Sequence, residues 1–356
     1  TDTLTKGNYN EGSSQWSPDG TSIVFVSNRT EDPDKNSNSD IFTIEAKTGS
    51  VEKQITSWKG SDNSPQWSPD GKSVAYLRST SDANYIMYDQ PILCVVPATS
   101  GESLLLSKSL DRPVSNPRWN KDGKNITAVV TDDCERYIST FDVKNGMMKK
   151  VIGGNRSFGS LEFHPDGSWV TSMSDSQLPS EFYALKDGNL RRLTSIQDDF
   201  VAGLSLATVE KFSSTSKDGV VVSNLLFLPA SAKKEKLPVI FYIHGGPVGQ
   251  DDFGFDLTRQ MLAAKGYAVI AVNYRGSNGR GIDFCKSIYA DWGNKEVLDI
   301  QGAADYLISK GIIDGNRMGI GGWSYGGILT DYTIAKDTRF KAAISGAGSA
   351  LQLSLY

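Results

Sequence analysis

Several features that define common protein classes are scarce in this sequence of 356 residues. Its only cysteines, Cys94, Cys134 and Cys285, stand in no metal-binding or redox spacing, which argues against a disulfide framework. Positive charge is not in excess, because 37 Lys and Arg residues stand against 41 Asp and Glu residues, so no nucleic-acid partner is expected. The longest apolar runs, such as residues 237–243, are far shorter than the roughly 20 residues of a membrane-spanning helix. No membrane partner is expected either.

The overall composition is that of a folded protein, with 38% hydrophobic and 22% charged residues. The length favours two or three domains, each large enough to bury a core of its own. The chain opens on Thr1 and Asp2 without a recognisable targeting segment, which leaves the compartment open between the cytoplasm and an exported location. Homo-oligomerisation is equally open.

A short motif recurs in the first part of the chain. The sequence Trp-Ser-Pro-Asp-Gly begins at residue 16 and again at residue 67, and looser copies begin at residues 119 and 163. Each copy precedes an alternating run rich in β-branched or aromatic residues, which predicts a strand. Asp-Gly suits the positive-φ corner of a tight hairpin, and the aromatic residue can wedge between adjacent sheets. We therefore interpret residues 1–205 as β-propeller blades of about 40 to 50 residues each.

The pattern changes after residue 205. Residues 206–236 are expected to hold a linker and the first strand of a second domain. Strand-like and helix-like stretches alternate over residues 237–356, as in a parallel α/β sheet. The expected strands are 238–243, 267–273, 318–320 and 341–345, and the expected helices are 256–265, one capped by Asn294 that ends at Gly311, and one from the Gly-rich turn to about residue 335.

The Gly-rich turn at residues 321–327 has the sequence Gly-Gly-Trp-Ser-Tyr-Gly-Gly. A strand before it and a helix after it are the context of a nucleophile elbow, in which a strained turn lifts a hydroxyl to the helix N-terminus. A β-carbon at Gly322 or Gly326 would crowd the place where strand and helix pass each other. Ser324 is the predicted nucleophile. The alternative is a glycine-rich turn with a passive serine.

A serine nucleophile also needs hydrogen-bond donors aimed at the developing oxyanion. One predicted donor is the backbone amide of Tyr325, directly after the nucleophile. The other is the amide of Gly246, in the His-Gly-Gly-Pro loop at residues 244–247, because its lack of a side chain lets a substrate carbonyl approach. The alternative is a turn that merely ends a strand.

Together these motifs resemble the prolyl oligopeptidase family of serine peptidases, in its acylaminoacyl-peptidase and dipeptidyl-peptidase-like branch. The resemblance rests on the repeats, the elbow, His-Gly-Gly-Pro at 244–247, Asn-Tyr-Arg-Gly-Ser at 273–277 and Asp-Trp-Gly at 291–293. It implies a β-propeller followed by an α/β-hydrolase domain, hydrolysis of short peptides, and neither a metal nor an organic cofactor. Branches that use a tyrosine hydroxyl as an oxyanion donor have tyrosine in place of His244. Two backbone amides are therefore the expected donors here.

The histidine content departs from the family pattern. Hydrolases of this fold order the triad Ser, Asp or Glu, then His, yet the two histidines, His164 and His244, both precede Ser324. We expect His164 to be structural within a blade and His244 to orient the oxyanion loop. Asp331 and Asp337 follow the serine too closely for the usual orienting role and are expected to be solvated. The hydrolase domain is therefore expected to be incomplete at its C-terminus, the propeller to be partial, and the catalytic Asp and His to be absent from this chain.

The expected function is that of a serine oligopeptidase, dipeptidyl-peptidase or acylaminoacyl-peptidase in which the propeller filters substrates by size. An esterase on the same scaffold, and a propeller-type binding protein with a degenerate hydrolase domain, are the alternatives. Arg275 is left outside the site, because it can bind a substrate carboxylate or pair structurally. The motifs do not specify the residue preferred at the scissile bond, or exo- against endopeptidase action.

Overall fold

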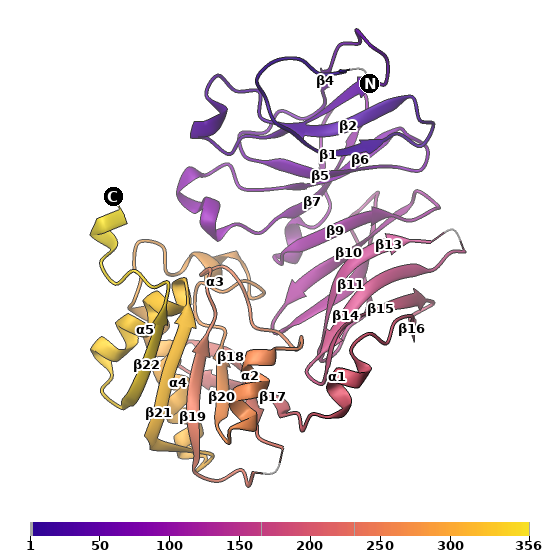
Figure 1. Ribbon diagram of the computed structural model, residues 1–356. Helices are drawn as coiled ribbons and strands as arrows, with labels where there is room; N and C mark the ends of the chain where they lie inside the picture. Colours follow the sequence, from indigo (N-terminus) through magenta and orange to yellow (C-terminus); the bar gives the residue numbers. More distant parts are fainter. Residues whose placement is uncertain (1–2, 165, 231, 356) are drawn as a thin grey trace.

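The computed structural model describes residues 3–164, 166–230 and 232–355. Antiparallel sheets build the N-terminal part, and a six-stranded sheet flanked by helices builds the C-terminal part (Figure 1). Within the described ranges, no helix is long and apolar enough to cross a membrane. Cys94, Cys134 and Cys285 are buried free thiols.

The first two sheets each contain four antiparallel strands in sequence order. Their strands are β1 (Glu11–Trp16), β2 (Ser22–Ser27), β3 (Asp40–Glu45) and β4 (Lys53–Gln54), then β5 (Asp62–Trp67), β6 (Ser73–Arg78), β7 (Ile92–Pro97) and β8 (Leu104–Leu105). Short 3₁₀ turns lie in the connections: η1 (Pro33–Lys35), η2 (Ala83–Tyr88) and η3 (Lys108–Leu110).

The third sheet has eight strands and consists of two antiparallel sets. The strands are β9 (Val114–Trp119), β10 (Asn125–Asp132), β11 (Glu135–Asp142), β12 (Met148–Ile152), β13 (Arg156–Phe163), β14 (Trp169–Asp175), β15 (Leu178–Lys186) and β16 (Asn189–Arg192). A single parallel pair, Arg136 with Ser157, joins β11 to β13. Each set therefore has the strand number and hairpin connections of the first two sheets.

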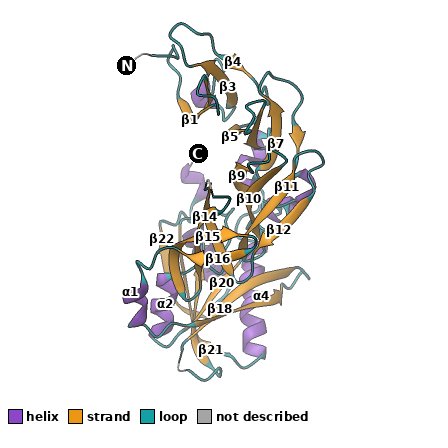
Figure 2. Cartoon of the chain, turned by 90° about the vertical axis from the view of Figure 1, so that its right-hand side faces the viewer, coloured by secondary structure: helices purple, strands orange, loops and turns teal. Residues whose placement is uncertain are grey.

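The recurring motif forms the turn between the first two strands of each set. Its glycines adopt positive φ, from 64° at Gly123 to 89° at Gly167, as expected for the hairpin corner. The Trp119 indole donates to the Gln66 carbonyl of the preceding sheet at 2.9 Å. The aromatic residue thus links neighbouring sheets, which follow one another along an arc (Figure 2). That these sheets belong to a propeller stays a prediction.

The six-stranded sheet has the order β17-β18-β20-β19-β21-β22. Its strands are β17 (Thr208–Thr215), β18 (Val221–Leu228), β19 (Leu237–Ile243), β20 (Ala268–Val272), β21 (Ile313–Trp323) and β22 (Phe340–Gly346). The last four run parallel, whereas β17 and β18 are antiparallel. The interval 206–236 therefore holds two strands of this sheet rather than the one expected, because the tight turn at Gly219 (φ 89°) folds it into a hairpin.

Helices cover both faces of this sheet (Figure 1). They are α2 (Leu257–Ala264), α4 (Lys295–Ser309) and α5 (Tyr325–Lys336). The short helices α1 (Asp198–Ala202), α3 (Ile282–Lys286) and η4 (Gln352–Leu355) lie in the connections before, within and after the sheet. Asn294 occupies the N-cap position of α4, but its side chain does not cap the helix as expected. Its amide instead donates to Asp291 Oδ1 at 2.6 Å.

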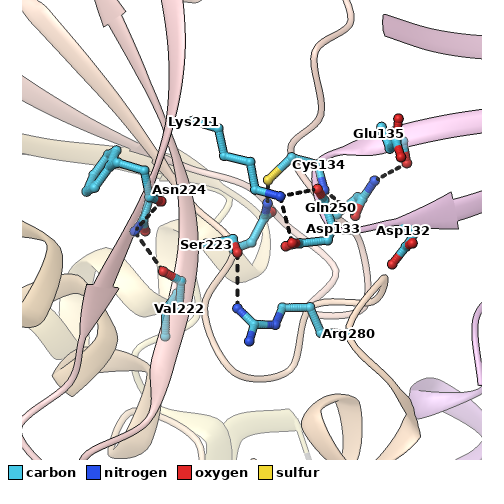
Figure 3. Close-up of polar contacts among 12 residues, drawn as sticks. Asp132, Asp133, Cys134, Glu135, Lys211, Val222, Ser223, Asn224, Gln250 and Arg280 are labelled. Atoms are coloured by element: carbon cyan, nitrogen blue, oxygen red, sulfur yellow. Dashed lines mark hydrogen bonds and ion pairs between the residues drawn. The ribbon is translucent and has the colours of Figure 1, made fainter. Parts of the chain in front are cut away.

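The hairpin turn between β10 and β11 joins the two parts of the molecule (Figure 3). The Asp133 carboxylate forms an ion pair with Lys211 Nζ at 2.6 Å, and the Asp133 amide donates to the Gly279 carbonyl at 3.0 Å. The Gln250 side chain accepts from the Cys134 amide at 3.2 Å and donates to the Glu135 carbonyl at 3.0 Å. The hairpin is therefore bound to the segment that directly follows the His-Gly-Gly-Pro loop.

Candidate active site

Ser324 lies between β21 and α5, with backbone angles φ 57° and ψ -123°. A non-glycine residue at such angles is strained by about 1 to 3 kcal/mol and persists only where its surroundings hold it. Here the Ser324 amide donates to the Gly346 carbonyl at 2.9 Å, and its carbonyl accepts from the Ile328 amide at 3.0 Å. The side chain is exposed at the N-terminus of α5. This geometry matches that of a nucleophile elbow. That Ser324 acts as a nucleophile stays a prediction.

The space around the elbow admits only glycine at two positions. A β-carbon on Gly322 would lie 2.4 Å from the Ile243 carbonyl oxygen, and one on Gly326 would lie 2.1 Å from the same atom. Both distances are well inside van der Waals contact, and the opposing atom belongs to the backbone of β19. The expected crowding of strand and helix at these two positions is confirmed.

The His-Gly-Gly-Pro loop packs directly against the elbow. A β-carbon on Gly245 would lie 3.3 Å from Ser324 Cβ and 3.7 Å from the Tyr325 amide nitrogen. Gly246 follows with φ 129°, is exposed, and precedes a cis peptide bond to Pro247. Tyr325 is the first residue of α5, and an amide at that position has no acceptor within its own helix. The structure brings these segments together. Their use as oxyanion donors stays a prediction.

His244 is held by hydrogen bonds at both ring nitrogens. Nδ1 lies 2.8 Å from the Gly245 carbonyl oxygen and Nε2 lies 3.0 Å from Ser277 Oγ. Burial lowers the pKa of His244, which favours a neutral ring. Because a carbonyl only accepts, Nδ1 carries the proton and Nε2 accepts from the serine hydroxyl. Tyr274 stacks on the ring at 4.5 Å and donates its hydroxyl proton to the His244 carbonyl at 2.8 Å.

His164 lies in the turn between β13 and β14, and its Nδ1 is 3.0 Å from Asp166 Oδ1. In the described part of the chain, neither histidine hydrogen-bonds to Ser324. Neither therefore sits as the serine's general base in this structure.

The expectation that Asp331 and Asp337 are solvated is wrong for Asp337. This carboxylate is buried and accepts from the Arg339 guanidinium at 2.7 Å and from the Arg339 amide at 3.0 Å. Burial opposes ionisation, but the hydrogen bonds from Arg339 outweigh it and hold the pKa of Asp337 below its usual value. Asp331 is half-buried and accepts from Ser345 Oγ at 2.9 Å.

Arg275 has a structural role in this fold. Its guanidinium is buried and pairs with Asp299 at 2.9 Å and with Asp218 at 2.5 Å. Asp299 also accepts from the Arg275 amide at 2.7 Å. Arg275 thus joins the β17–β18 turn to α4, and its charge is already neutralised by two carboxylates.

Sequence reasoning did not single out Glu296, which the structure places beside the elbow. Its Oε1 accepts from the Tyr325 hydroxyl at 2.5 Å and from the Gly293 amide at 2.7 Å. A glutamate three residues after the glycine of Asp-Trp-Gly, at the start of a helix, is the local signal that indicates such a capping contact. Among the described residues, no group of three or more His, Cys, Asp or Glu side chains is arranged to hold a metal ion.

Comparisons with known proteins agree with the motifs. Residues 253–356 match the sequence model of the prolyl oligopeptidase family. "Uncharacterized peptidase YuxL" of Bacillus subtilis is 30% identical over 362 residues, which cover 96% of this chain and 54% of that protein. "Dipeptidyl-peptidase 5" of Porphyromonas gingivalis is 27% identical over 344 residues, covering 94% of this chain and 49% of that protein. The resemblance expected from the motifs is confirmed.

The fold is also shared with solved peptidases. The acylaminoacyl peptidase of Pyrococcus horikoshii superposes with a TM-score of 0.80 at 24% identity, over 96% of this chain and 52% of that one. This likeness concerns the fold alone. The chain spans about half the length of the curated relatives it matches.

Proposed function

We propose that this chain, whose residues 253–356 match the prolyl oligopeptidase family, carries the nucleophile of a serine peptidase that hydrolyses short peptides. The observation that carries the proposal is Ser324 itself. It is an exposed hydroxyl on a strained strand-to-helix turn, with the glycine loop of residues 244–247 packed against it. Peptidases among the relatives support the same class of reaction.

In the proposed reaction, Ser324 Oγ attacks the scissile carbonyl carbon and loses its proton to a general base. The new oxyanion is bound by the amides of Gly246 and Tyr325. The base returns the proton to the leaving amine as the carbon–nitrogen bond breaks, and water then hydrolyses the acyl-enzyme. The positive end of α5 faces the same atoms, because Tyr325 begins that helix.

The proposal takes the general base and its orienting carboxylate from outside residues 1–356. Two observations support this. His164 pairs with Asp166 in its own hairpin, and both nitrogens of His244 are occupied by Gly245 and Ser277. The curated relatives are also about twice as long as this chain. The hydrolase domain is accordingly proposed to be continued by a further segment.

The antiparallel sheets are proposed to be propeller blades that restrict access to Ser324. Their contacts with the hydrolase part support this role. Gln250, just after the glycine loop, is bound by the β10–β11 hairpin, and Tyr88 of the second sheet's connection accepts from the Trp292 indole at 2.7 Å. A cover fixed on two sides would admit short peptides and exclude folded proteins.

The test is turnover of a fluorogenic peptide library with free and acylated N-termini by the complete protein and by its Ser324→Ala variant. Removing the nucleophile is expected to lower kcat by at least roughly a thousandfold while the fold is kept. Ser309→Ala, at an exposed serine of α4, is the matched control and should retain full turnover. Residual activity of Ser324→Ala within tenfold of wild type would rule out the assignment.

A further inference from the structure

The Asp-Trp-Gly turn at residues 291–293 is not accounted for by the nucleophile or the oxyanion loop. It lies between α3 and α4 and contacts the elbow helix through two residues. The Trp292 ring packs edge-on against the Tyr325 ring, with centroids 4.9 Å apart. Gly293, at φ 81°, fits where a β-carbon would lie 2.4 Å from the Tyr332 ring. The turn is therefore shaped to the surface of α5.

Helix α5 is bound at its last residue to this turn and at its first residue to the start of α4. At its last residue, Lys336 Nζ donates to the Gly293 carbonyl at 2.5 Å and to Asn294 Oδ1 at 2.6 Å. At its first residue, the Tyr325 hydroxyl donates to Glu296 Oε1 at 2.5 Å. Since Tyr325 directly follows Ser324, the second contact lies one residue from the proposed nucleophile.

Glu296 is an unusual partner for such a contact. Its side chain is fully buried in the first turn of α4. Both hydrogen bonds, from Tyr325 and from Gly293, fall on Oε1, whereas Oε2 is buried without a partner among the described residues. Burial raises the pKa of Glu296. A buried carboxyl oxygen without a donor costs stability, so an explanation based on fold stability alone accounts poorly for an acid at this position.

We propose that Glu296 is a positioning residue for the oxyanion hole. By holding the Tyr325 hydroxyl, it fixes the ring and so the Tyr325 amide that faces the developing oxyanion. The Tyr274 ring stacks on Tyr325 with centroids 5.9 Å apart, so the tyrosine is held by two aromatic rings and through its hydroxyl. The inference rests on the proposed function, because it concerns transition-state stabilisation at Ser324.

The contacts predict a distinctive order among variants. Glu296→Gln keeps an oxygen at the Oε1 position and should retain kcat within roughly threefold, because Oε2 contributes no hydrogen bond. Glu296→Leu removes the acceptor and Tyr325→Phe removes the donor. Each should lower kcat roughly tenfold with KM nearly unchanged, less than the roughly hundredfold or more that follows loss of an oxyanion donor. The double variant should lose no more than either single one.

The experiment measures kcat and KM of the complete protein per active site titrated with a fluorophosphonate, together with the melting temperature. Glu181→Leu is the matched control, since Glu181 is a buried acid in β15 that accepts from the Gln197 amide at 2.8 Å. It should lower the melting temperature but leave kcat per titrated site unchanged. Glu296→Leu and Tyr325→Phe should lower kcat per titrated site, whereas Glu296→Gln should keep it close to the wild-type value.

Two outcomes overturn the inference in distinguishable ways. An active wild type whose Glu296→Leu variant keeps kcat per titrated site within twofold shows that Glu296 is only structural. If that variant does not fold, Tyr325→Phe decides by the same criterion. A wild type that neither turns over peptides nor reacts with the fluorophosphonate overturns the proposed function, and this inference with it.

Discussion

A β-carbon on Gly326 would lie 2.1 Å from the carbonyl oxygen of Ile243. Gly326 is in the first turn of α5 and Ile243 is the last residue of β19. Helix α5 therefore crosses β19 so closely that only a residue without a side chain fits at the crossing. This crossing places Ser324 next to the loop that follows β19. The glycine is therefore required by the relation between two elements rather than by its own backbone angles.

Gly326→Ala is expected to destabilise the fold by roughly 3 kcal/mol, because neither backbone segment can move without displacing the sheet or the helix. Denaturant unfolding measures the change. Gly203→Ala is the matched control, since nothing lies within 4 Å of its β-carbon position, and it should change stability little. Equal unfolding midpoints for the two variants would contradict the crossing described here.

The Asp133–Lys211 ion pair predicts a pH-dependent contact between the N-terminal antiparallel sheets and the six-stranded sheet. Burial opposes ionisation of Asp133, but the hydrogen bonds to its carboxylate and the charges of Lys211 and Arg280 together outweigh burial, so the folded pKa lies below the unfolded value of about 3.9. The stabilisation is therefore present above about pH 4 and is lost as the pH falls through the folded pKa. The melting-temperature difference between wild type and Asp133→Asn should be larger at pH 7 than at pH 3. A difference independent of pH would argue against the pair.

The thiol of Cys134 reports whether the β10–β11 hairpin stays docked. It is buried, burial raises its pKa to about 12, and it accepts from the Asn273 amide at 3.1 Å. Iodoacetamide should modify Cys134 slowly at pH 8. Gln250→Ala removes two hydrogen bonds to the hairpin and should accelerate this reaction. Cys94, buried in another sheet with its pKa also raised to about 12, is the internal control, and its rate should not change.

The proposed cover predicts selection by substrate size. A short unstructured peptide should be cleaved much faster than a globular protein, because sheets that cover Ser324 would leave only narrow routes to it. Cleavage rates for a nonapeptide and for a folded protein that contains the same sequence in a loop provide the comparison. Comparable rates would show that the sheets do not restrict access.

The elbow could be predicted from the sequence because its requirements are local. A strand, a serine between spaced glycines and a following helix occupy consecutive residues, and the hairpin corners at Gly20, Gly71, Gly123 and Gly167 are local in the same sense. Each depends on the backbone angles or the space at one position. Such constraints restrict the residue type at that position, most often to glycine.

The long-range contacts between the elbow, the hairpin and the rest of the fold were harder to predict from the sequence. Glu296 meets Tyr325 across 29 positions of sequence, and Asp133 meets Lys211 across 78. A glutamate or an aspartate is ordinary on a protein surface, so residue type alone does not indicate a distant partner. The burial of Asp337 was missed although its partner, Arg339, is only two residues away, because the carboxylate also accepts from Gln301 of α4, 36 positions earlier in the sequence.

The most direct test of the central claim is covalent labelling of the complete protein with a fluorophosphonate, followed by mass mapping of the modified residue. An activated serine reacts with this reagent, whereas an ordinary surface serine does not. The account predicts one modified site, Ser324, and loss of labelling in Ser324→Ala. Failure of the folded wild type to react, or modification of a different serine, would contradict it.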